Sequence, residues 1–329
     1  MPWSHPPRSG DALPGRLIGL VLTGSAAQVG VEPFIMELIA GMEDALLLPE
    51  PGPPNGALLL PEPGPSDGAS PLPEAGPAHR REDPWATVLL LVVPDLQAEL
   101  ATYRRWAGDH TVEAVVVVNL VHDDVRPERL EKLGMPAVLA GRYAGPAALS
   151  SVVADNAGAI TAAMRLLIEL GHRVIGRVSG PVELVHTADR SAAMRATGQR
   201  LRVDVRILEA DYSAEAGALA ARQLLAAAQA PTAIIFDNDV MAVAAEEELV
   251  RAGVEVPGRL SLLACDDSTL CELAVPPMSA ISIDVHEHGV TLGRALLDVL
   301  SGAPHQVYPG PPIRIRRRES TGSAPLPGS

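Results

Sequence analysis

The sequence predicts an α/β protein in which two lobes each hold a doubly wound parallel sheet. Short apolar runs, which are typical of buried strands, alternate with segments whose apolar residues recur at helical spacing. We expect about ten strands and eight or nine helices, which is more than one ordinary sheet accommodates. The chain has 329 residues, enough for two domains of ordinary size. Two similar lobes fit these observations better than one.

The segment 233–268 is the unit around which this prediction is built. Residues 233–236 (AIIF) and 260–265 (LSLLAC) are apolar runs typical of buried strands. The residues between them have helical spacing, with Gly253 placed to end the helix. Strand, helix and strand of this length form a right-handed parallel crossover, so both strands end at the same edge of one sheet.

Polar side chains follow both strands at that edge. Asn238 and Asp239 come after the first strand, and Asp266 and Asp267 come after the second. Ligands of open parallel sheets bind beyond the carboxyl ends of the strands. Amide and carboxylate groups suit a hydroxyl-rich small molecule. Each pair alone is better explained as an ordinary helix cap, but two pairs on neighbouring strand ends favour a ligand site.

The remaining elements are predicted by the same patterns. Strands are expected at 16–23, 88–93, 112–118, 137–140, 174–178, 203–208 and 280–283, with a last one inside 311–320. Helices are expected at 33–46, 96–106, 126–133, 155–170, 187–199, 214–228 and 287–300.

A tandem twelve-residue repeat interrupts this alternation. Residues 45–56 (ALLLPEPGPPNG) are followed by 57–68 (ALLLPEPGPSDG) and by a divergent copy at 69–80 (ASPLPEAGPAHR). Its Pro and Gly content is incompatible with a regular helix, and Pro removes hydrogen-bond donors from strands. A proline-rich docking segment is one interpretation. We favour a low-complexity expansion in a surface loop.

Composition excludes several classes of function. The net charge of −14 argues against contact with nucleic acid, because phosphate binding needs clustered Lys and Arg. Cys265 and Cys271 are the two cysteines, and we expect reduced thiols in a cytoplasmic protein. The first 15 residues are expected to be disordered and have no apolar signal core. No apolar run approaches the roughly 20 residues that cross a bilayer, so no membrane contact is expected.

No motif indicates catalysis, a cofactor or a metal. Gly-x-Ser-x-Gly, P-loop and zinc spacings do not occur in the sequence. His286 and His288 are two residues apart, which does not place them on one helix face, and no third ligand is evident. Residues 314–318 (RIRRR) are either a nucleic-acid patch or, as we favour, the solvated face of a strand.

Taken together, these segments resemble the ligand-sensing core of the LacI/GalR (lactose-repressor/galactose-repressor) type of transcriptional regulator. The similar segments, which span about residues 16–321 in the order of that family, are RLIGLVL, DNAGAITAAMRLLIELGHRVIGRVSGP, ADRSAAMR, PTAIIFDNDVMAVAA, VPGRLSLLACDDS, VPPMSAISID and IRRREST. The resemblance implies the type I fold of periplasmic sugar-binding proteins. The expected parts are a lead-in (1–15), an N-terminal lobe (16–171 plus 284–302, with an insertion at 47–84), a C-terminal lobe (172–283 plus 303–321) and a tail (322–329).

The resemblance also implies a ligand cleft with five residues. Arg190 matches an arginine that forks onto ligand hydroxyls, and Asn238 and Asp266 match a cleft asparagine and aspartate. Asn119 matches a polar residue of the N-terminal lobe, and Tyr212 lies where an aromatic ring often stacks on a sugar. A planar guanidinium flanked by Asp and Asn can bind vicinal hydroxyls through several directed hydrogen bonds. The implied effector is a sugar or another polyol.

Departures from the family pattern bear on the expected function. Family members usually begin with a helix-turn-helix and hinge, whereas the 15 residues before the first predicted strand show no such pattern. We therefore expect DNA contact only through a helix-turn-helix that this chain does not show. Ala193 and the pair at 264–265 replace a usual glycine and a usual glycine–aromatic pair, which reshapes the pocket. A homodimer is expected, formed largely by the helices after the first two strands.

Two alternatives from other classes share the fold. A solute-binding protein of a transporter would have the same cleft, and a signal peptide or a lipobox cysteine would favour it. An enzyme on this fold is the least favoured alternative, because the sequence offers no clear pair of nucleophile and base.

Overall fold

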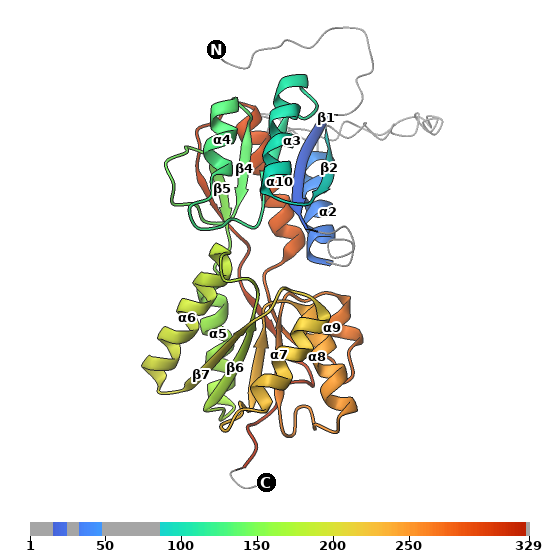
Figure 1. The fold of residues 1–329 in the computed structure, drawn as a ribbon, viewed down its shortest axis with the longest axis vertical. Helices are drawn as coiled ribbons and strands as arrows, with labels where there is room; N and C mark the ends of the chain where they lie inside the picture. The colour runs from blue at the N-terminus through green and yellow to red at the C-terminus, as the bar shows by residue number, and fades with distance from the viewer. Residues whose placement is uncertain (1–15, 25–32, 48–85, 327–329) are drawn as a thin grey trace, which may run out of the picture.

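The computed structural model describes residues 16–24, 33–47 and 86–326. Within them the chain forms two α/β lobes, stacked one above the other in Figure 1. The predictions on the lead-in 1–15 and on the repeat, apart from residues 45–47, lie outside the described residues. Among the described residues, no helix is both long and apolar enough to cross a membrane.

The first lobe is built on a parallel sheet of six strands in the order β11-β5-β4-β3-β1-β2. The strands are β1 (Arg16–Thr23), β2 (Ala86–Val93), β3 (Ala114–Val117), β4 (Ala137–Ala140), β5 (Ser150–Val153) and β11 (Val307–Pro309). Its helices are α2 (Pro33–Leu47), α3 (Leu96–Asp109), α4 (Arg126–Leu133) and α10 (Val285–Leu300). Alternate residues of β1 face opposite sides: Ile18 and Leu20 pack with α2 and α10, and Val21 packs with α3 and α4.

The second lobe repeats this architecture with the order β12-β10-β9-β8-β6-β7. The strands are β6 (Val174–Ser179), β7 (Asp204–Glu209), β8 (Ala233–Phe236), β9 (Ser261–Cys265), β10 (Ser279–Ser282) and β12 (Arg314–Arg316), the last antiparallel to β10. Its helices are α5 (Asn156–Glu169), α6 (Val185–Leu201), α7 (Ala214–Leu225), α8 (Asp239–Arg251) and α9 (Thr269–Leu273). Helices α5 and α6 cover one face, and α7 and α8 the other. The predicted fold class, two doubly wound lobes, is confirmed.

The division of the chain between the lobes differs from the expected one. Helix α5 was expected in the N-terminal lobe, but Ile160 and Met164 belong to the core of the second sheet with Ile175. Residues 303–321 were assigned to the C-terminal lobe, but β11 pairs with β5 of the first sheet. An amphipathic pattern predicts that a helix has a buried face without saying which sheet buries it, and this explains the difference at α5. At β11 the sequence pattern predicts no strand, so its pairing with the first sheet was not expected.

Three segments therefore cross between the lobes. They connect β5 to α5, β10 to α10, and β11 to β12, and Figure 1 shows them passing through the narrow middle of the molecule. The carboxyl ends of the parallel strands of each sheet lie next to these crossings, and polar residues follow several of those strand ends. This is the edge at which open parallel sheets bind ligands.

Helix α2 packs on α10 at unusually short range because both helices carry glycine at the contact. A Cβ on Gly289 would lie 2.2 Å from the carbonyl oxygen of Leu38, and a Cβ on Gly41 would lie 2.0 Å from that of His286. Neither position has room for any larger residue in this arrangement. The helix pair forms part of the first-lobe core through Met42 and Leu292.

Candidate functional site

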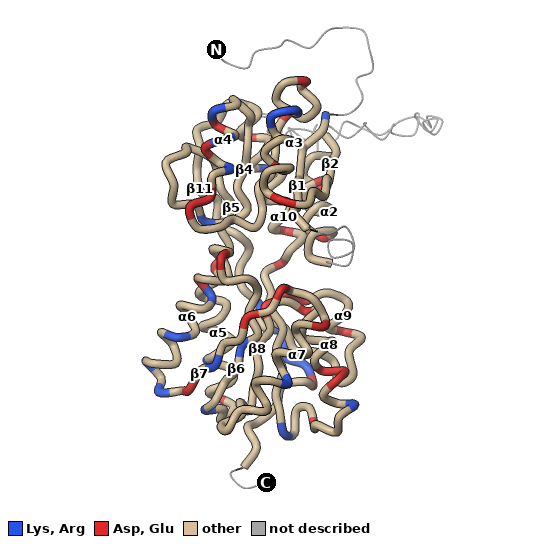
Figure 2. Tube along the Cα trace, viewed as in Figure 1, with Lys and Arg blue, Asp and Glu red and all other residues tan. Residues whose placement is uncertain are grey.

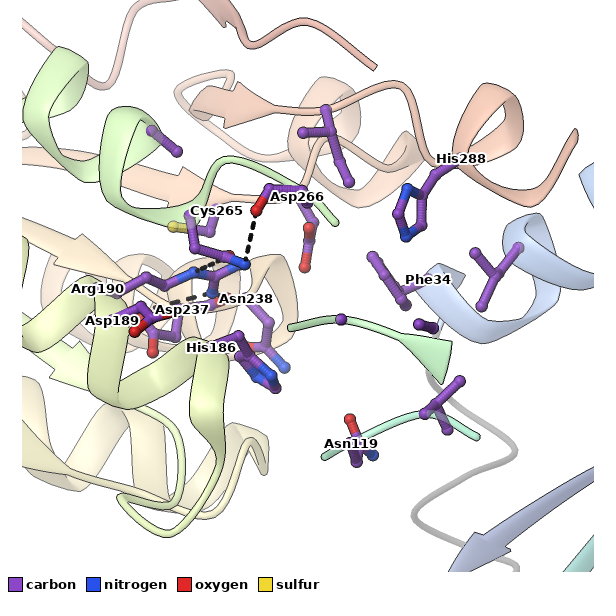
Figure 3. A pocket seen from close by; sticks show the side chains of 18 of the residues that line it. Phe34, Asn119, His186, Asp189, Arg190, Asp237, Asn238, Cys265, Asp266 and His288 are labelled. Atoms are coloured by element: carbon purple, nitrogen blue, oxygen red, sulfur yellow. Dashed lines mark hydrogen bonds and ion pairs between the residues drawn. The ribbon is translucent and has the colours of Figure 1, made fainter. Parts of the chain in front are cut away.

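A cleft lies between the two lobes beside the crossing segments. All five residues expected at a ligand site line it: Asn119, Arg190, Tyr212, Asn238 and Asp266. Figure 3 shows Arg190, Asn238 and Asp266 on the side of the second lobe, facing Asn119, Phe34 and His288 of the first lobe. The sequence prediction therefore placed these residues together correctly, and their role as ligand contacts stays a prediction.

One edge of the cleft is closed by contacts between the lobes. The amide of Val185 donates to the carbonyl oxygen of Leu120 at 2.9 Å, and the amide of His122 donates to that of Glu183 at 3.3 Å. Arg142 of the first lobe forms an ion pair with Asp189 of α6 at the rim. The two backbone bonds join the loop after β3 to the start of α6, which brings Asn119 near the second lobe.

Arg190 on α6 is held by groups on two sides. Its Nε donates to Asn156 Oδ1 at 2.9 Å, and its Nη1 donates to the carbonyl oxygen of Asp237 at 3.1 Å. Its side chain is 15% exposed, within the cleft. Burial alone would lower the pKa of Arg190, but nearby acidic groups, including Asp237 and Asp266, raise it above its ordinary value. Arg190 is therefore a fixed cation in the cleft wall.

Asn238 serves both as a helix cap and as a cleft residue. Its Oδ1 accepts the amide of Met241 at 2.9 Å at the start of α8, and its Nδ2 donates to the carbonyl oxygen of Tyr212 at 3.2 Å. The two interpretations of Asn238 are thus compatible. The next residue, Asp239, is 4% exposed, and its Oδ2 has no hydrogen-bond partner among the described residues.

Three of the five residues have a left-handed backbone. The φ angles are 51° at Asn119, 69° at Tyr212 and 71° at Asp266. Non-glycine residues in this region cost about 1–3 kcal/mol, less for Asn and Asp, and persist where the surrounding structure imposes them. At Asn119 the constraint is visible, because Arg126 Nη2 donates to its carbonyl oxygen at 2.9 Å. Strained backbone of this kind gathers at ligand sites, which supports a functional role for the cleft.

Tyr212 supplies an aromatic wall held by His186. The hydroxyl of Tyr212 lies 2.8 Å from His186 Nε2, and the two rings are stacked at 28° with centroids 6.5 Å apart. Burial, with a contribution from Arg190, lowers the pKa of His186 to about 3. The imidazole is therefore neutral at physiological pH, so its Nε2 can accept a hydrogen bond from the hydroxyl of Tyr212.

Several cleft residues were missed by the sequence prediction. They are Phe34 at the start of α2, His186 and Asp189 of α6, Asp237 after β8, and His288 of α10. Phe34 was assigned to the apolar face of its helix, and the sequence does not show that this face opens into the cleft. Asp237 could have been found, because it precedes Asn238 at the same strand end.

His286 and His288 have different surroundings. His286 lies against α2, with its Nε2 3.1 Å from Asp44 Oδ2 and its Nδ1 3.2 Å from Glu37 Oε1. His288 lines the cleft at 5% exposure, and burial lowers its pKa to about 4. The cysteines are free thiols, and burial raises the pKa of Cys265 in the cleft wall to about 12.

Comparison with known proteins identifies the family. A family profile described as a periplasmic binding protein-like domain matches residues 164–321. The HTH-type transcriptional regulator CelR of Thermobifida fusca is 33% identical over 202 residues, 60% of this chain and 59% of CelR. A LacI family transcriptional regulator from Bifidobacterium animalis subsp. lactis is 30% identical, with a TM-score of 0.75 over 94% of this chain and 98% of that structure. This chain belongs to the LacI family.

The LacI-family resemblance seen in the sequence is therefore confirmed, with its periplasmic-binding-protein-like sensor fold. A solved complex of the transcriptional regulator CelR with cellobiose has the same fold, with a TM-score of 0.75 at 24% identity over 94% of this chain and 86% of that one. All three relatives are transcriptional regulators. The chain spans about 59% of the length of the curated CelR sequence.

Proposed function

We propose that this chain is the effector-sensing core of a LacI-type regulator and that it binds a small sugar or another polyol between its lobes. The observation that carries this proposal is the convergence of five residues in one cleft, three of them with a left-handed backbone: Arg190, Asn238, Asp266, Asn119 and Tyr212. The cleft takes these groups from both lobes, so a bound molecule would connect them. Ligand binding there can then bias the angle between the lobes.

The chemistry of the cleft suits a polyol. Arg190 offers N–H donors, Asp266 offers carboxylate acceptors, and Tyr212 with Phe34 offers aromatic faces for the C–H surfaces of a sugar ring. A few directed polar groups on an apolar lining are typical of small-molecule sites. We propose binding without catalysis, because the high pKa of Cys265 disfavours a thiolate nucleophile.

Relatives support the class of effector and the role in regulation. CelR is 33% identical to this chain, and a solved CelR structure contains cellobiose. We propose that the chain acts on transcription in the cytoplasm as a homodimer and reaches DNA only through a helix-turn-helix element. The exposed apolar residues Met36 of α2, Leu273 of α9 and Val275, which are 56%, 74% and 80% exposed, are compatible with contact between two copies.

A thermal-shift screen tests the proposal. The chain would be titrated with cellobiose, maltose, ribose and other mono- and disaccharides, beside apolar compounds of similar size. We expect at least one sugar to raise the melting temperature in a saturable way, because a ligand of the native state stabilises it by mass action. Calorimetry would then measure the affinity, and sedimentation would measure the oligomeric state. A panel in which no sugar or polyol binds would contradict the proposed effector class.

A further inference from the structure

A buried ion pair lies directly behind the cleft, between Arg177 of β6 and Asp237 at the end of β8. Both side chains are completely buried. Two parallel hydrogen bonds join them, Nε to Oδ1 at 2.7 Å and Nη2 to Oδ2 at 2.6 Å. Strands β6 and β8 are neighbours, with Arg177 opposite Ile235, so the pair bridges two adjacent strands near the ligand edge.

Arg177 also binds the helix that carries Arg190. Its Nη1 donates to Ser191 Oγ at 2.8 Å, and its Nη2 approaches the carbonyl oxygen of Thr187 at 3.4 Å. These two partners lie on the same part of α6 as Arg190. One buried guanidinium therefore connects Asp237 to the stretch of α6 from which Arg190 enters the cleft.

Asp237 meets both arginines but in different ways. Arg190 donates to its backbone carbonyl oxygen at 3.1 Å, while its Nη1 stays 3.9 Å from Oδ1, beyond hydrogen-bond range. The carboxylate itself is engaged elsewhere, by Arg177 at both oxygens and by the amide of Gly180 at 3.0 Å. Figure 3 shows Arg190 beside Asp237 and close to Asp266 in the cleft wall.

Stability alone does not account for this pair. A buried ion pair is costly to desolvate, and well-packed apolar residues are often as stabilising in its place. Neighbouring positions on the same strands, such as Ile175 and Ile235, are apolar core residues. The distinctive consequence of having Arg177 here is that it occupies a carboxylate which would otherwise form a two-point contact with Arg190.

We propose that Arg177 is a positioning residue for effector recognition: by holding the Asp237 carboxylate, it keeps the guanidinium of Arg190 directed into the cleft. This inference rests on the proposed function, since it concerns the availability of Arg190 to an effector. It can be tested without knowing the effector, because an accessible guanidinium reacts with phenylglyoxal whereas one captured by a carboxylate is protected.

The experiment compares the rate at which phenylglyoxal modifies Arg190 with the rate for Arg105, an exposed residue of α3. Digestion with a protease that does not cut at arginine, followed by mass spectrometry, measures both rates in the same protein. We expect Arg177→Met to lower the rate of phenylglyoxal modification of Arg190 by about fivefold or more, because Asp237 then pairs with Arg190. In the double variant Arg177→Met with Asp237→Asn, the modification rate of Arg190 should return to within about twofold of the wild-type rate, since the Asp237 carboxylate is no longer there to capture it.

Two controls keep the outcome decisive. Arg177→Lys retains the charge but cannot engage both carboxylate oxygens in one plane, so its Arg190 should be modified at an intermediate rate. This variant keeps the test available if Arg177→Met does not fold. Leu249→Ala, a buried change at the far end of α8, should lower the melting temperature and leave the Arg190 rate unchanged. An Arg190 rate equal to that of the wild type in Arg177→Lys, or a double variant that stays slow, would overturn the proposal.

A sugar that binds in the screen gives a separate result. It should protect Arg190 in the wild type and bind about tenfold or more weakly to Arg177→Met, because the cation that it contacts is withdrawn. If no sugar protects Arg190, the proposed effector class fails while the dependence of Arg190 on Arg177 stands. If a sugar protects Arg190 but the variants leave its rate unchanged, the positioning role fails alone.

Discussion

Arg126 donates a 2.9 Å hydrogen bond to the carbonyl oxygen of Asn119, and so holds the backbone of a cleft residue in the left-handed region. Arg126 is in turn paired with Asp124 at 2.6 Å and with Glu99 at 3.0 Å, all with nearly buried side chains. The second lobe has a similar arrangement, in which Arg177 and Asp237 lie behind Arg190. In each lobe a buried arginine–carboxylate group thus supports a residue of the cleft.

Arg126→Met should destabilise the protein by about 3–5 kcal/mol, because it leaves two buried carboxylates without their cation. Urea denaturation would measure the free energy of unfolding. Lys132→Met is the matched control: its ion pair with Glu128 is exposed, and its loss should cost less than about 1 kcal/mol. If both changes altered the free energy of unfolding equally, the buried carboxylates of Asp124 and Glu99 would not need the charge of Arg126.

Arg190→Ala should weaken binding of any sugar found in the screen by about 2–4 kcal/mol, because charged hydrogen bonds are lost and their partners stay unpaired. Calorimetric titration of the folded variant measures this. Arg195→Ala, an exposed position on the same helix, should bind as the wild type does. If Arg190→Ala bound the sugar with wild-type affinity, Arg190 would not be a ligand contact.

Much of the cleft was predictable because it follows strand ends. Asn238 and Asp266 follow strands of one parallel crossover, and that topology alone places them at one edge. The positions of Phe34 and His288 were not predictable in this way. They depend on which face α2 and α10 turn to the cleft, and that is decided by contacts such as the one between Gly289 and Leu38, which are distant in sequence.

Glu246 should make stability depend on pH. It is 1% exposed, its Oε1 has no hydrogen-bond partner among the described residues, and burial raises its pKa from 4.5 to about 7. A carboxyl whose pKa is raised by folding stabilises the native state below pH 4.5, and this contribution disappears as the pH rises through 7. Above that pH the protein is less stable, because ionisation of Glu246 favours the unfolded chain, in which the carboxylate is solvated.

Glu246→Gln removes this titration. Relative to the wild type, the variant should gain about 1–2 kcal/mol of stability between pH 5 and pH 8, which is less than the full pKa difference implies because part of the titration lies below pH 5. Urea unfolding at a series of pH values would measure it. Glu247→Gln, at a neighbouring position that is 70% exposed, should show no such gain. A flat difference for Glu246→Gln would mean that the carboxylate is solvated in the native state.

The glycine contact between α2 and α10 should be intolerant of any side chain. Gly289→Ala places a methyl group against the backbone of Leu38 and should destabilise the protein by about 1–3 kcal/mol through forced separation of the helices. Gly108→Ala in α3 is the matched control, because nothing lies within 4 Å of its added Cβ. That change should be neutral or stabilising, since alanine favours helix. Thermal denaturation of both variants would compare them, and similar melting temperatures would contradict the close contact.

The last prediction concerns DNA. The chain carries a net charge of −14, and Figure 2 shows Lys and Arg scattered among acidic residues over both lobes. The charge of the basic segment at β12 is partly offset by its neighbours: Arg316 and Arg318 pair with Asp267 at 2.9 and 2.7 Å, and Arg314 lies 4.0 Å from Asp284. A phosphate backbone would have to displace these carboxylates, so the solvated-face interpretation of this strand is favoured over a nucleic-acid patch.

We therefore expect the 329-residue chain to bind duplex DNA no better than background at near-physiological salt. Fluorescence anisotropy with genomic fragments would measure this, and Arg316→Ala would serve as a control for any contact made by β12. A salt-sensitive, sequence-selective signal that Arg316→Ala abolishes would show that β12 reads DNA despite its ion pairs. A selective signal that the variant leaves intact would place the DNA contact elsewhere in the chain and contradict the prediction equally.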